Sequence, residues 1–81
     1  MAKKKTKRPY SFGEVHRNKW LGNKITEVIG ADRKRLGWLW THTDGRVIVS
    51  PHLGFYIWFD GDGERWTQES GAMWLVTARL P

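Results

Sequence analysis

LGWLWTHTDGRVIVSPHLGFYIWFDGDGERW, residues 36–66, is the stretch of sequence that decides the fold. Its apolar runs are separated by Asp44-Gly45 and Asp62-Gly63, and an Asp-Gly pair between apolar runs is a strong signal for a β-hairpin. The stretch therefore predicts four short strands in two hairpins. It also holds four of the six tryptophans, so the rest of the chain is organised around it.

The first hairpin predicts one face of the core. If Asp44 and Gly45 alone form the loop, as a type I′ turn, Gly45 has a positive φ and Trp40 lies opposite Val49. Because side chains alternate along a strand, every second residue then lies on the same face. The face with the larger apolar side chains, which we expect to be core, carries Trp38, Trp40, Val47 and Val49.

The second hairpin permits a two-residue loop at residues 62–63 or a four-residue loop at residues 60–63. These registers differ by two residues, so they place the same side chains on the same face. One face is apolar, and we expect it to be buried with Trp66 as core: Phe55, Ile57, Phe59 and Trp66. The other face is amphipathic, and there we expect Trp58 to be partly exposed: Tyr56, Trp58, Arg65 and Thr67.

The flanking segments complete a small all-β domain over residues 10–81. Residues 15–20 and 24–29 are either two strands or one short helix interrupted at Gly22, and β-branched residues favour the strands. Residues 30–35 form a basic loop, residues 68–71 a polar turn and residues 72–80 a last strand. Five to six short antiparallel strands predict a small barrel or a rolled sheet of SH3-like or OB-like type.

Charge is distributed unevenly along the 81 residues. The net charge is +6, and residues 1–35 hold eleven of the fourteen Lys and Arg residues. Residues 1–9 read as a flexible basic arm, because they have five cations and no large apolar cluster to bury. A basic half of this kind indicates a polyanionic partner.

Composition argues against several other classes. The chain has no cysteine, so it has neither disulfides nor a thiolate zinc site. The three histidines lie far apart in sequence, and turn chemistry explains the acidic residues 60–64. We therefore expect no enzyme, no metal and no cofactor. No apolar run is long enough to span a membrane, and the basic start lacks the apolar segment of a secretory signal. These features predict a cytoplasmic protein, or a nuclear one in a eukaryote, because residues 4–7 resemble an import cluster.

The sequence predicts a nucleic-acid-binding module, for DNA or RNA, in which cations contact phosphates and an aromatic sheet face stacks bases. The residues expected to make these contacts are Lys3, Lys4, Lys5, Lys7, Arg8, Arg33, Lys34, Arg35, Tyr56, Trp58 and Arg65. The alternative is a protein-binding inhibitor or adaptor, encoded by a phage or mobile element, that docks through exposed Trp and Arg side chains. The sequence contains no known motif that recognises particular bases, so it predicts no base preference.

Overall fold

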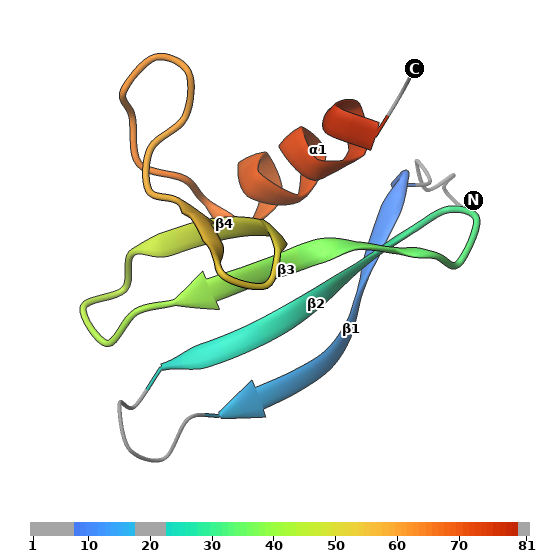
Figure 1. Cartoon of the computed structure of the whole chain (residues 1–81), viewed down its shortest axis with the longest axis horizontal. Coiled ribbons are helices and arrows are strands. Elements are labelled where there is room, and N and C mark those ends of the chain that lie inside the picture. Colours follow the sequence, from blue (N-terminus) through green and yellow to red (C-terminus); the bar gives the residue numbers. More distant parts are fainter. Residues whose placement is uncertain (1–7, 18–22, 80–81) are drawn as a thin grey trace, which may run out of the picture.

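A computed structural model describes residues 8–17 and 23–79, which form one antiparallel sheet and one helix (Figure 1). The strands pair in the order β1-β2-β3-β4-β5, so each one lies beside its neighbour in sequence. The elements are β1 (Tyr10–Arg17), β2 (Lys24–Gly30), β3 (Arg35–Thr41), β4 (Val47–His52), β5 (Phe55–Ile57) and α1 (Gln68–Arg79).

The sheet is open, with β1 and β5 as its two edge strands in the described part of the chain. A mostly-β domain with five antiparallel strands is confirmed, whereas closure into an SH3-like or OB-like barrel is wrong. The physical reason is that α1 covers one face of the sheet, by packing against β3 and β4. The apolar side chains of that face are buried by a helix rather than by a strand that closes the sheet on itself.

The segment before the first predicted hairpin is a pair of strands rather than a helix. β1 and β2 pair over most of their length, for example at Tyr10 with Gly30 and at His16 with Ile25. A register shift between Phe12 and Val15 interrupts this pairing. The choice of strands is thus confirmed for residues 15–17 and 24–29, while residues 18–22 and the arm residues 1–7 lie outside the described residues.

The helix occupies the segment for which the sequence predicted a polar turn and a last strand, and that prediction is wrong. Its start is capped reciprocally: the Ser70 N–H donates to Thr67 Oγ1 (3.0 Å), and the Thr67 N–H donates to Ser70 Oγ (2.9 Å). Such bonds satisfy N–H groups that lack a partner at a helix start. Glu69 adds a negative charge to the first turn, where it interacts favourably with the helix dipole.

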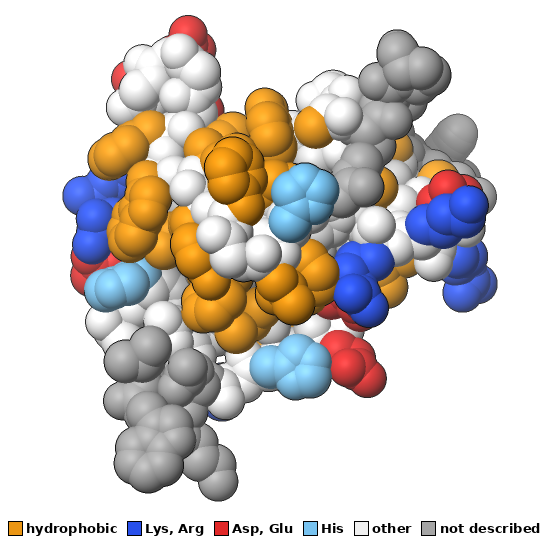
Figure 2. Space-filling view, viewed as in Figure 1, with side chains coloured by type: hydrophobic (Ala, Val, Ile, Leu, Met, Phe, Trp, Pro, Cys, Tyr) orange, Lys and Arg blue, Asp and Glu red, His pale blue; other side chains and the backbone are white. Residues whose placement is uncertain are grey.

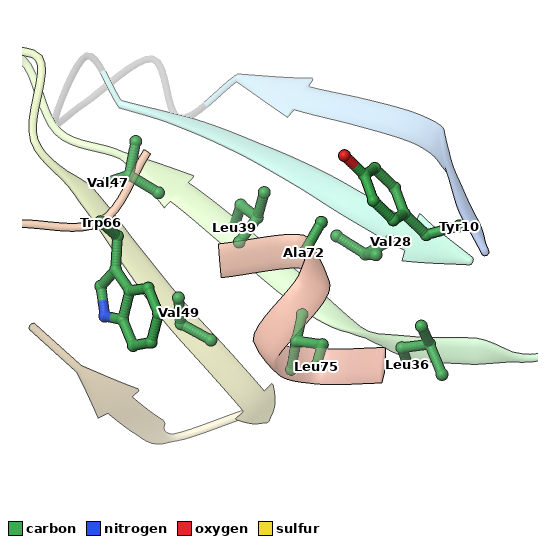
Figure 3. Close-up of a cluster of buried hydrophobic side chains, with 9 residues drawn as sticks. All are labelled: Tyr10, Val28, Leu36, Leu39, Val47, Val49, Trp66, Ala72 and Leu75. Atoms are coloured by element: carbon green, nitrogen blue, oxygen red, sulfur yellow. The ribbon is translucent and has the colours of Figure 1, made fainter. Parts of the chain in front are cut away.

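The core lies between α1 and the sheet (Figure 3). Ala72 and Leu75, three residues apart on the helix, are fully buried against the strands. The helix backbone comes close to the sheet at Gly71, where an added Cβ would lie 2.9 Å from Val49 Cγ2 and 3.0 Å from Leu39 Cδ2. The buried cluster comprises Tyr10, Val28, Leu36, Leu39, Val47, Val49, Trp66, Ala72 and Leu75. We call the opposite side of the sheet the open face.

Three tight turns in the described chain, at residues 30–34, 42–46 and 60–64, share one geometry. In each turn the first N–H donates to the fifth carbonyl (2.7–2.9 Å), and the fourth N–H donates to the first carbonyl (2.9–3.0 Å). The fourth residue is left-handed, with φ of 71° at Arg33, 93° at Gly45 and 78° at Gly63. These are three-residue loops, built as a type I turn followed by a left-handed residue. The positive φ expected at Gly45 is confirmed.

The three-residue loop shifts the first Asp-Gly hairpin by one residue from the predicted register. Trp40 pairs with Ile48, whereas the two-residue loop predicts Val49 as its partner. A slip of one residue reverses which side chains of β3 share a face with those of β4. The prediction that Trp38 and Trp40 belong to the core is therefore wrong, because both lie on the open face. Val49 is fully buried in the core, as expected.

The second Asp-Gly hairpin has a register between the two that were predicted, because Phe59 pairs with Arg65. Trp66 is only 6% exposed, which confirms that it is core. Its indole N–H donates to the carbonyl of Ile57 (3.1 Å). The expectation that Phe55 and Phe59 share this burial is wrong: their exposed fractions are 54% and 50%.

Replacing Arg33 by glycine should stabilise the domain. A left-handed conformation costs an ordinary L-residue roughly 1–2 kcal/mol, whereas glycine adopts it readily. After the larger unfolded-state entropy of glycine is counted, we expect a net gain of about 1 kcal/mol and a rise in Tm of about 4–8 °C. Calorimetric melting curves measure this rise in Tm.

The matched control is Ala31→Gly, at an exposed position of the same turn without a positive φ. Here glycine brings only its entropy cost, so the Tm should fall slightly. An Arg33→Gly variant that melts no higher than the parent protein would contradict the turn geometry.

Candidate functional site

Four large aromatic side chains gather on the open face. Trp38 and Trp40 project from β3, and the Trp40 ring packs edge-to-face against Tyr56 of β5, with ring centroids 5.3 Å apart. Ile48 of β4 lies on this face next to Trp40 and is buried although α1 packs on the opposite face. Figure 2 shows hydrophobic side chains over the middle of this face, with cationic side chains at both sides. We call the set Trp38, Trp40, Tyr56 and Trp58 the aromatic patch.

One end of the patch carries an arginine stacked on tryptophan. The Arg35 guanidinium lies 4.9 Å from the centre of the Trp38 ring, and its Nε donates to Glu27 Oε2 (2.7 Å). This hydrogen bond, together with one from the backbone N–H of Glu14, holds the pKa of the Glu27 carboxyl below its usual value. Glu27 is therefore ionised at neutral pH and fixes Arg35 over the ring.

The other end repeats the arrangement with different residues. The Arg46 guanidinium lies 5.1 Å from the centre of the Trp58 ring, and its Nε donates to Asp44 Oδ2 (2.8 Å). The backbone N–H of Arg46 and then its side chain hold the pKa of the Asp44 carboxyl below its usual value. In both arrangements the carboxylate bonds to Nε, and within the described residues the terminal Nη groups make no hydrogen bond.

The predicted aromatic residues lie where a ligand can reach them, but their predicted cation does not accompany them. Tyr56 and Trp58 are 45% and 41% exposed, so the expected partial exposure of Trp58 is confirmed. Arg65 instead forms an isolated antiparallel β-bridge with Phe59. The cations found over rings in the described part of the chain are Arg8, Arg35 and Arg46.

The other predicted cations lie at the end of the sheet near Arg35. Arg33 and Lys34 are exposed in the turn that joins β2 to β3. Arg8 lies just before β1, with its guanidinium 5.8 Å from the centre of the Tyr10 ring. The arm residues Lys3, Lys4, Lys5 and Lys7 lie outside the described residues.

Sequence reasoning missed Trp38, Trp40 and Arg46 as members of the site. The signal that could have found them is the loop length at Asp44-Gly45, because a three-residue loop reverses which side chains share a face. In that register both tryptophans leave the core face. Arg46 then closes the turn as its fifth residue, directly before β4 and two positions before Ile48.

Residues 8–17 and 23–79 were also searched for a metal site and for a membrane-spanning helix. No group of three His, Cys, Asp or Glu side chains there is arranged to hold a metal ion. No helix in these residues is long and apolar enough to cross a membrane.

The chain was also compared with known proteins. No family model, no curated protein and no solved structure matches it.

Proposed function

We propose that the protein binds single-stranded nucleic acid on the open face of its sheet. The observation that supports this most is the pair of arginine–tryptophan stacks, Arg35 on Trp38 and Arg46 on Trp58, at the two ends of the aromatic patch. Aromatic rings on a sheet surface stack unpaired bases, and an arginine plane does the same while its N–H groups contact phosphate. A patch that alternates these two chemistries suits a ligand that alternates bases and phosphates.

A single strand fits this surface better than a duplex does. In a duplex the bases stack on one another and turn their flat faces away from a protein surface, so the aromatic patch gains nothing from them. Phosphate contacts are available in both kinds of ligand. We therefore expect single strands of DNA or RNA to bind more tightly than duplex DNA of equal length.

The basic residues outside the patch supply contacts that do not depend on sequence. Arg33 and Lys34 directly precede Arg35 in the chain, so a strand lying on the patch passes close to their turn. The basic arm adds Lys3, Lys4, Lys5, Lys7 and Arg8. Each phosphate neutralised on a single strand adds about 0.7 to the slope of log affinity against log salt. Binding should consequently weaken as salt rises.

Replacing Trp58 by alanine should weaken single-strand binding without unfolding the domain. Losing one base-stacking ring costs about 1–3 kcal/mol of binding free energy, which is roughly 5- to 150-fold in Kd. Because the ring is 41% exposed, we expect the melting temperature to change little. Fluorescence anisotropy with labelled single-stranded DNA, single-stranded RNA and duplex DNA at several salt concentrations measures the effect.

Met73→Ala is the control for this experiment, since Met73 is similarly exposed but lies on α1, away from the open face. Its affinity for all three probes should match that of the parent protein. Equal losses in the two variants, or tighter binding of duplex than of single strands, would count against stacking on the patch.

Exposed apolar side chains favour a second candidate function, the binding of a protein partner. Leu53 is 70% exposed at the turn between β4 and β5, next to Phe55 at 54%. Apolar and aromatic side chains with arginines at their border have the composition of interface hot spots. If the full-length protein binds no oligonucleotide at low salt, this second function replaces the first.

A further inference from the structure

A pocket of about 350 Å³ lies at the end of the sheet where β3 begins and β4 ends. Its volume is at the lower end of the range for small-molecule sites, about 300–1,000 Å³, so it has room for one small ring system rather than a long ligand. The pocket is open to solvent and joins the aromatic patch through Trp38. Its lining consists of Arg35, Gly37, Trp38, Pro51, His52 and Leu53.

The walls of this pocket offer two kinds of contact. Trp38, Pro51 and Leu53 provide apolar surface, and Leu53 reaches it from an exposed turn. Arg35 provides a positive charge and N–H donors beside that surface. A planar, partly apolar ring with an anionic group attached matches this combination.

The charged and turn residues of the pocket are held in place before any ligand arrives. Glu27 binds the Arg35 Nε, and the Trp38 ring supports the guanidinium from one side. Ser50 is fully buried and its hydroxyl donates to the carbonyl of His52 (2.6 Å), which fixes the chain at the start of the β4–β5 turn. A preformed site loses less entropy when it binds a ligand.

We propose that this pocket takes one base of the bound strand, with the phosphate of that nucleotide on Arg35. The inference rests on the proposed function and deepens it, because it assigns a single-nucleotide subsite within the open face. The base lies against Trp38 and Leu53, and the terminal N–H groups of Arg35 face the phosphate.

A second pocket suggests where the strand continues. It has a volume of about 240 Å³, and it is lined by Arg8, Tyr10, Ser11, Gly30, Ala31 and Arg33. That turn leads directly to Arg35, so the two pockets lie at the same end of the sheet. Two arginines and a hydroxyl group suit the next phosphate along the strand.

Nuclear magnetic resonance of the ¹⁵N-labelled full-length protein tests the base subsite. Uridine monophosphate should shift the resonances of the Trp38 indole N–H and of the Gly37 and Leu53 amides. Uridine should shift the same resonances more weakly, because it lacks the phosphate. Inorganic phosphate should leave the Trp38 and Leu53 resonances in place, and the same shifts with phosphate alone would reduce the pocket to an anion site and overturn the assignment.

Two charge-matched variants complete the test. Leu53→Asp places a negative charge at the mouth of the pocket, on an exposed turn, and should weaken uridine monophosphate binding by about tenfold or more. Met73→Asp adds the same charge on α1 and should leave that affinity almost unchanged. Equal effects of the two substitutions would contradict the subsite.

The outcomes for the subsite and for the proposed function are separable. If oligonucleotides bind but uridine monophosphate shifts none of the pocket resonances, the subsite is wrong and the proposed function stands. If no oligonucleotide binds, the proposed function fails and the subsite fails with it. Arg33→Gly probes the second pocket: because this substitution should raise the Tm, a loss of oligonucleotide affinity in that variant would come from the missing cation and not from unfolding.

Discussion

Replacing Trp66 by alanine should unfold the domain or come close to doing so. The Trp66 ring is 6% exposed, packs against Trp74 with ring centroids 6.0 Å apart, and donates its indole N–H to the carbonyl of Ile57. Truncating a buried tryptophan costs about 3–5 kcal/mol. Small domains have a total stability of about 5–15 kcal/mol, so one substitution removes a large part of it.

Trp66 also links parts of the chain that are far apart in sequence. It forms an isolated bridge with Val47 at the start of β4, and it directly precedes the capped start of α1. Its loss therefore loosens the contact between β5 and the core as well as the entry into the helix. Trp58→Ala is the comparison, because its ring lies on the open face. Circular dichroism melts that show equal Tm losses for the two variants would contradict the assignment of core and open face.

The second large effect is expected at Gly37, for which alanine should cost about 1–3 kcal/mol or more. A Cβ added to Gly37 would lie 2.6 Å from the carbonyl oxygen of Ser50 and 3.1 Å from the Cα of Pro51. Both atoms belong to the backbone of β4, which cannot move aside without breaking its pairing with β3. The same Cβ would lie 3.0 Å from Leu75 Cδ2, so the Leu75 side chain would have to shift too.

Gly61 supplies the control for this substitution. A Cβ on Gly61 meets no atom within 4 Å, so Gly61→Ala should change the free energy of unfolding by less than about 0.5 kcal/mol. Urea unfolding curves of both variants give the two values. A Gly37→Ala protein as stable as Gly61→Ala would mean that β3 and β4 are farther apart than the structure places them.

The strands were predictable from the sequence because their signals are local. Apolar runs bounded by Asp-Gly pairs mark strand positions, and β-branched residues distinguish β2 from a helix. The exposure of Tyr56 and Trp58 followed from the same alternation. Register was less predictable, because Asp44-Gly45 and Asp62-Gly63 suit both a two-residue and a three-residue loop, and the two loops differ by one residue.

The Asp32-Arg33-Lys34 segment shows why this ambiguity could not be resolved from turn residues alone. It forms the same turn as the two Asp-Gly segments although arginine occupies the left-handed position. In this turn and in the one at residues 42–46, the aspartate carboxylate accepts a hydrogen bond from the backbone N–H two residues later: Asp32 accepts from Lys34, and Asp44 accepts from Arg46. The aspartate, rather than the glycine, is thus the feature that the two turns share.

The helix was missed because its apolar spacing fits two periods. Trp74 and Val76 alternate as in a strand, while Ala72, Leu75 and Val76 also satisfy the spacing of three and four residues of a helix. The deciding signal is the cap formed by Thr67 and Ser70. A capping pair before an apolar run indicates a helix start, and it outweighs an alternation of only a few residues.

The nearest-neighbour order of the sheet has a consequence for how fast the chain folds. Every strand pairs with the next one in sequence, and the connections from β2 to β3 and from β3 to β4 are three-residue loops, so closing these hairpins costs little chain entropy. Folding rates fall as contacting residues lie farther apart in sequence. We therefore expect refolding in the millisecond range, at the fast end for β proteins, with the docking of α1 against β1 as the late, long-range step.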